Sequence, residues 1–215
     1  TKALDIANLL ARRLPEALGA GTAVGIGVAT SRCLVGTVGS ASARWMAAVG
    51  AAAEGAPTLA RLAADVVAMA APFDAAAPPL VLATGSCFTT TGGLFRGRLV
   101  DTVGLAARWR GRLHEPSKRP AGVYEVLGRV ASGGGDQEWM YEIAAPQAGG
   151  TTGPPPLERA LTALSSGNAP LAVSVLESQP TAAAGDRCAA ALLSTARVVA
   201  AAGGGATWRR LTLAH

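Results

Sequence analysis

Cysteine and histidine are the side chains best suited to bind a metal ion or to act as nucleophiles, and this chain has few of them. Its 215 residues include three cysteines, Cys33, Cys87 and Cys188, and two histidines, His114 and His215. The cysteines lie far apart without a CxxC pair, which argues against a zinc site, and their odd number argues against a disulfide framework. We therefore expect buried thiols in a reducing compartment, with Cys33 in a core strand, and no metal site or catalytic thiol.

A glycine-rich stretch at residues 25–39 and the carboxylate of Glu54 are the next candidates for chemistry. Backbone amides of such a stretch can cradle phosphate, but no helix with a lysine at its start follows these glycines as it does in a P-loop. The preferred interpretation is hairpin geometry. Glu54 is either an active-site acid or, as we prefer, a carboxylate in the first turn of a helix, where the helix dipole stabilises it.

Positive charge is concentrated between Arg96 and Arg119. The chain has 19 basic and 14 acidic residues, a net charge of +5. A GC-rich genome, which favours arginine, would give this bias without a functional cause; the alternative is an acidic partner, such as nucleic acid or an acidic filament surface. Only Trp109 lies among the basic residues, so bases have no stacking platform and nucleic-acid binding is not expected. Two interpretations are open for the basic residues of this segment: they belong to a solvated loop, or they contact an acidic partner. These residues are Arg108, Arg110, Arg112, Lys118 and Arg119.

The composition predicts a folded chain. Half of the residues are hydrophobic and 15% are charged, which provides enough apolar surface for a core. No run approaches the roughly 18 apolar residues of a membrane-spanning helix, and there is no charged-then-apolar leader. We expect a cytoplasmic protein. Because the first residue is Thr1 and not Met, we also expect a piece of something longer.

Hydrophobic periodicity predicts an α+β body over residues 1–145. Asp5 is the expected N-cap of its first helix, Pro15 would break or kink that helix, and Pro57 suits the first turn of the second. The expected elements are an amphipathic helix at 5–18 with its large apolar residues on one face, a hairpin of strands 24–28 and 34–38, an extended run at 45–49, a helix at 54–71, strand 80–83, a polar loop with or without a helical turn at 84–93, and strands 95–105 and 123–127.

The remainder of the chain is expected to be helical. Residues 146–156 are rich in Gly and Pro and read as a linker. Two apolar-periodic segments between residues 157 and 201 predict a helical hairpin, so that residues 157–215 form a tail after the body.

Four short motifs occur in a fixed order along the body. In this order they resemble the catalytic domain of class III adenylate and guanylate cyclases, and the resemblance covers most of residues 4–128. It implies a partial cyclase-like sheet, derived from a ferredoxin-like arrangement, and a partner that is another cyclase-like domain, since such domains pair face to face. The motifs are GIGVAT at 25–30, VGTVGS at 35–40, FRGRLVDTVGL at 95–105 and VYEVLG at 123–128.

The chain departs from the family pattern where the catalytic groups should lie. Aligned without gaps to the family's GDxxNxxxR motif, the Asp, Asn and Arg positions hold Ala51, Glu54 and Thr58. In the family these side chains help read the base, orient the ribose and stabilise charge on the phosphates. Alanine cannot bond a base, and Glu54 would repel phosphate. The family's two metal-binding aspartates correspond to positions before Thr1, so no metal or cofactor site is predicted.

These observations support one leading hypothesis and two alternatives. The first is a catalytically inactive, cyclase-like structural module in a large assembly, whose partners are other proteins. Because the composition and the resemblance are typical of a protist or algal protein, a cytoskeletal location such as the axoneme of a cilium or flagellum is the expectation. The second is part of an active cyclase that makes cAMP or cGMP from a nucleoside triphosphate with Mg²⁺ or Mn²⁺. The third is a basic ribonucleoprotein subunit.

Overall fold

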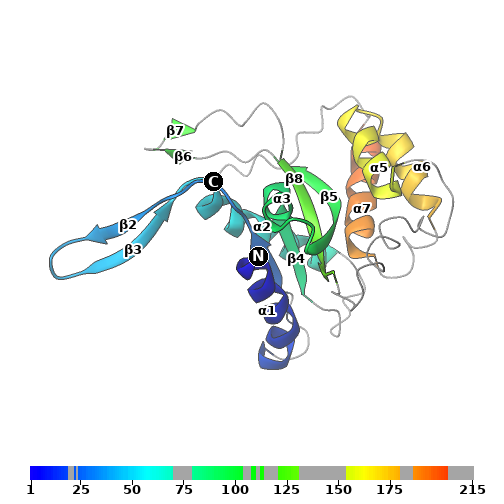
Figure 1. Ribbon diagram of the computed structural model, residues 1–215. Helices are drawn as coiled ribbons and strands as arrows, with labels where there is room; N and C mark the ends of the chain where they lie inside the picture. The colour runs from blue at the N-terminus through cyan, green and yellow to red at the C-terminus, as the bar shows by residue number, and fades with distance from the viewer. Residues whose placement is uncertain are drawn as a thin grey trace.

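A computed structural model of the chain describes residues 1–18, 22, 24–69, 79–103, 108–109, 112–113, 121–130, 154–179 and 186–202. The architecture is α+β, as the sequence predicts: a mixed four-stranded sheet carries helices on both faces, and three further helices pack together at the C-terminal end (Figure 1). A two-stranded hairpin projects from this body (Figure 1).

The sheet joins strands from distant parts of the sequence. Strand β4 (Leu80–Thr84) lies in the middle of the body and is buried along its whole length, as its continuous apolar run predicts. It pairs in parallel with β1 (Gly25–Val28) and antiparallel with β8 (Ala121–Arg129), which in turn pairs with β5 (Phe95–Val103). The strand order is therefore β1-β4-β8-β5.

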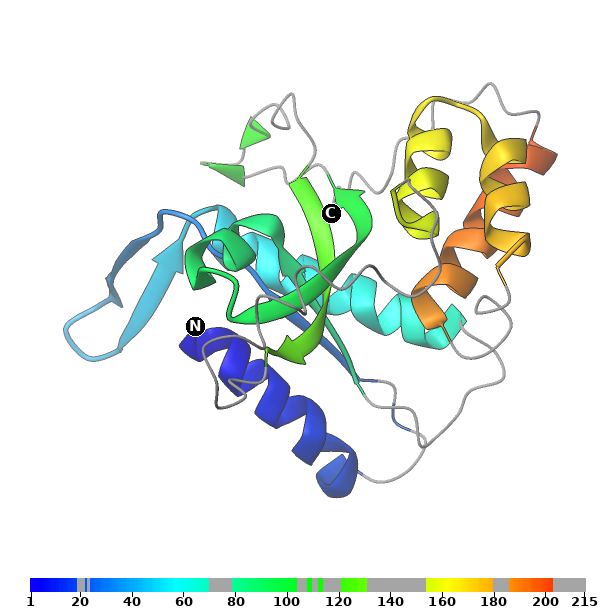
Figure 2. The same cartoon turned by 45° about the vertical axis from the view of Figure 1, so that its right-hand side comes forward.

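Two apolar clusters cover the two faces of the sheet. Helix α2 (Ala51–Met69) and the C-terminal helices fill one cluster together with alternate residues of the sheet, among them Leu80, Leu82 and Val123. Helices α1 (Lys2–Leu18) and α3 (Gly85–Thr91) pack against the opposite face, on Val81 and its neighbours. Figure 2 shows α2 passing behind the sheet while α1 lies on the near side.

Helix α2 lies unusually close to β1. A Cβ atom on Gly25 or Gly27 would come within 3.0 Å of backbone atoms of α2, at Ala60 and Ala64 or at Ala56 and Ala60. Glycine is needed here because the helix backbone occupies the space of a side chain. Gly25 and Gly27 therefore serve the packing of α2 on β1, and not the hairpin geometry that the sequence predicts for them.

The predicted hairpin is wrong in its pairing. Residues 24–28 do form a strand, but β1 pairs with β4 across the whole α2 crossover. The second predicted strand, β2 (Leu34–Gly39), pairs instead with β3 (Arg44–Val49), the third extended run. The pattern of alternating apolar residues identifies strands but does not choose their partners, and the β1–β4 pairing is long-range.

Helix α1 also differs from its prediction. It begins at Lys2, so Asp5 lies in the first turn and is not the N-cap, and Pro15 lies within a continuous helix. The residues that face the sheet are Leu4 and Ala7. The large apolar side chains that were expected to be buried point outward instead, with exposed fractions of 57% for both Ile6 and Leu9. The contact of the helix with the sheet is narrow, because Leu4 and Ala7 are its buried residues, and its wider apolar side faces solvent.

Helix α2 and the segment after β4 also differ from their predictions. Helix α2 begins three residues before the expected start, so Pro57 lies in its second turn, and its buried side chains include Leu59, Leu62, Ala63 and Val67. The polar segment after β4, expected to be a loop with or without a helical turn, forms the short helix α3.

Within residues 154–179 and 186–202, the C-terminal part has three helices where two were predicted. They are α5 (Pro156–Ser165), α6 (Ala169–Glu177) and α7 (Arg187–Ala201). Gly167 ends α5 with a φ of +80°, and its N–H and that of Asn168 bond the last carbonyls of the helix at 2.9 and 2.8 Å. The Asn168 side chain then caps α6 by accepting from the Leu171 N–H at 3.2 Å. This stop and restart divides the first predicted helix in two.

Candidate interaction surface

The hairpin formed by β2 and β3, residues 34–49, is called the arm below. It extends away from the sheet and the helices (Figure 1). At its tip the Ser40 N–H donates to the Ala43 carbonyl at 2.9 Å, and the Ala43 N–H donates to the Ser40 hydroxyl at 3.2 Å. Gly39 has a φ of +133°, a conformation that other residues rarely adopt. The tip is thus closed by its own hydrogen bonds.

One face of the arm is entirely apolar. Because alternate residues of a strand point to opposite faces, the cross-strand pairs Leu34–Val49, Gly36–Ala47 and Val38–Trp45 share a face, which we call the stripe. Its large side chains are exposed, Leu34 by 69% and Trp45 by 59%. Contiguous exposed apolar surface of this kind marks sites of protein interaction.

The other face of the arm is mixed. It carries Val35, Thr37, Met46 and Ala48, and Met46 is 77% exposed. The arm and its connections, residues 24–53, contain the arginines Arg32 and Arg44 and no acidic residue. The arm is therefore largely apolar and carries no negative charge.

Contacts at its base attach the arm to α2. The Ser31 hydroxyl accepts a hydrogen bond from the Ala52 N–H at 2.8 Å and so satisfies a free donor in the first turn of the helix. Cys33 lies beside it, with its Sγ 3.5 Å from the Ser31 hydroxyl. Cys33 is exposed, so the expectation of a buried core thiol is wrong for this cysteine and right for Cys87 and Cys188.

The three positions at which the chain departs from the cyclase pattern follow the base of the arm. Ala51 is the first residue of α2, Glu54 lies in its first turn, and Thr58 lies one turn further on. Their spacing of three and four places them on one side of the helix. Ala51 and Glu54 are exposed, while Thr58 is partly buried.

The basic residues predicted to contact an acidic partner fall largely outside the described part of the chain. Arg108 belongs to β6 (Arg108–Trp109) and Arg112 to β7 (Arg112–Leu113), two short strands that pair with each other. Arg110, Lys118 and Arg119 lie outside the described residues. The prediction about these five residues stays a prediction.

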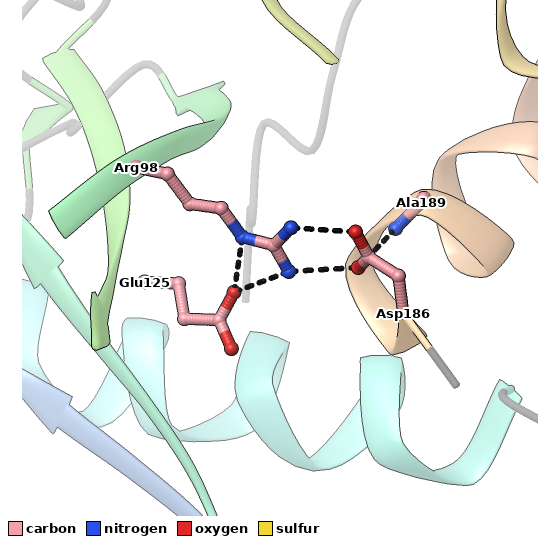
Figure 3. Close-up of polar contacts among 4 residues, drawn as sticks. All are labelled: Arg98, Glu125, Asp186 and Ala189. Atoms are coloured by element: carbon pink, nitrogen blue, oxygen red, sulfur yellow. Dashed lines mark hydrogen bonds and ion pairs between the residues drawn. The ribbon is translucent and has the colours of Figure 1, made fainter. Parts of the chain in front are cut away.

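Sequence reasoning missed a charged cluster between the sheet and the C-terminal helices (Figure 3). Arg98 of β5 donates from its two Nη atoms to the carboxylate of Asp186, at 2.5 and 2.7 Å, and from Nε to Glu125 of β8, at 2.6 Å. Asp186 also caps α7 by accepting from the Ala189 N–H at 3.1 Å. One guanidinium therefore joins two strands to the start of a helix.

The cluster changes the titration of its members. Burial alone would lower the pKa of Arg98, but hydrogen bonding to Asp186 and the charge of Glu125 outweigh it and hold the pKa above its ordinary value. Burial alone would raise the pKa of Asp186, and the hydrogen bonds from Arg98 and Ala189 outweigh that effect and lower it. For the Cys188 thiol, burial raises the pKa, and the nearby charge of Glu125 adds to the rise. Arg98 and Asp186 stay ionised at neutral pH, and Cys188 stays a thiol.

Within the described ranges, no group of three or more His, Cys, Asp or Glu side chains is arranged to hold a metal ion. No helix in the same part of the chain is long and apolar enough to cross a bilayer.

Comparison of the chain with protein-family models, with curated proteins and with solved structures found no match.

Proposed function

We propose that this chain is a catalytically inactive, cyclase-like module that binds another protein, of cyclase-like fold, through its arm. The observation that carries the proposal is the stripe: an apolar face with exposed Leu34, Val38 and Trp45 on a hairpin that projects from the body. A two-stranded hairpin is marginally stable alone in water, and burial of its apolar face against a partner would stabilise it.

Two further observations support the cyclase-like part of the proposal. The motif GIGVAT covers β1 and the two residues after it, and VGTVGS covers most of β2 and Ser40 at the tip of the arm, so both motifs begin on strands. Helix α2 begins two residues after the end of β3, in line with the strand-then-helix order of the family.

We infer the loss of catalytic activity from three residues on one side of the first turns of α2. Ala51, Glu54 and Thr58 present a methyl group, a carboxylate and a hydroxyl there. None of them supplies the positive charge that a polyphosphate transition state needs, and Glu54 opposes it. We place the module in a large assembly, and a cytoskeletal one such as an axoneme suits this role.

The catalytic part of the proposal is tested with the purified chain, ATP or GTP, and Mg²⁺ or Mn²⁺. No cyclic nucleotide should form. Production of cAMP or cGMP that is lost when the chain is heat-denatured would overturn the inactive assignment and favour the active cyclase.

The binding part is tested by mixing the chain with a class III cyclase catalytic domain and measuring association by analytical ultracentrifugation. Complex formation is expected, with loss in a Val38→Asp variant. The matched control is Met46→Asp, on the opposite face of the arm, which should bind as the wild type does. Equal binding by both variants would show that the stripe is not the contact.

A further inference from the structure

We draw no further inference here: the strongest candidate, the exposed apolar side of helix α1 formed by Ile6, Leu9 and Leu10, carries no proposal, because nothing in the part of the chain that the structure describes shows what covers it.

Discussion

Arg98 and Asp186 are 88 residues apart in the sequence, yet they form a two-pronged ion pair between β5 and the start of α7 (Figure 3). Their heavy atoms approach to 2.5 and 2.7 Å, and both side chains are partly shielded from water. The pair shows how the C-terminal helices are held on the sheet by directed polar contacts as well as by apolar packing.

Replacement of Arg98 by lysine should destabilise the fold although the charge is kept. An ammonium group cannot span Asp186 and Glu125 with the fixed fork of a guanidinium. We expect the free energy of unfolding to fall by about 1–3 kcal/mol, a range reduced for the partial exposure of the site. Urea unfolding measures it, with Arg96→Lys on the exposed side of the same strand as the control. If the two variants have equal midpoints, the fork contributes nothing.

The lowered pKa of Asp186 predicts how stability depends on pH. A carboxyl whose folded pKa lies below its unfolded value of about 3.9 contributes stability that is complete above that value and is lost as pH falls through the folded pKa. The stability difference between the wild type and Asp186→Asn should therefore be constant from neutral pH to about pH 5 and shrink below about pH 4. Unfolding curves at a series of pH values test this, and a difference that grows with acid would contradict it.

Alanine at Gly27 should be strongly destabilising because its Cβ would overlap the backbone of α2 at Ala56 and Ala60. We expect a loss of about 1–3 kcal/mol, as for overpacked cores. Gly36→Ala is the control, since its Cβ meets open space. Similar effects at the two glycines would mean that α2 does not restrict β1.

The cysteines should differ in reactivity toward a thiol reagent. Cys33 is exposed, whereas Cys87 and Cys188 are buried and the pKa of Cys188 is raised. One thiol per chain should react at once in the native protein, and all three should react after denaturation. The Cys33→Ser variant should show no fast phase. Fast reaction of that variant would place another thiol at the surface.

The sequence predicts those parts of the fold in which local pattern and final environment agree. Helix α2 and strand β4 are examples, since the apolar residues of each are the ones that become buried. Helix α1 fails this test: its hydrophobic pattern suggests one buried face of large apolar residues at 6–18, while Leu4 and Ala7 make the buried contact with the sheet. Nothing in a local window reveals how closely a neighbouring strand allows a helix to approach.

Contacts between segments that are distant in the sequence could not be predicted either. The pairing of β1 with β4 and the meeting of Arg98 with Asp186 depend on chain segments that are distant in the sequence, so periodicity carries no information about them. The break between α5 and α6 could have been predicted from the sequence, because Gly167 followed by Asn168 is typical of the end of one helix and the start of the next. The exposure of the arm could not have been predicted, since strands with alternating apolar residues also occur in sheets that are buried on one face.

The apolar cluster that α2 shares with the C-terminal helices has a consequence for synthesis of the chain. Residues as late as Leu192 and Ala196 complete the cover over Leu80 and Leu82. A ribosome makes the strands long before these helices, so the nascent sheet has one face incomplete until the last helix emerges. Such intermediates are prone to aggregate, and a chaperone that occupies this face during translation would protect the protein until α7 is made.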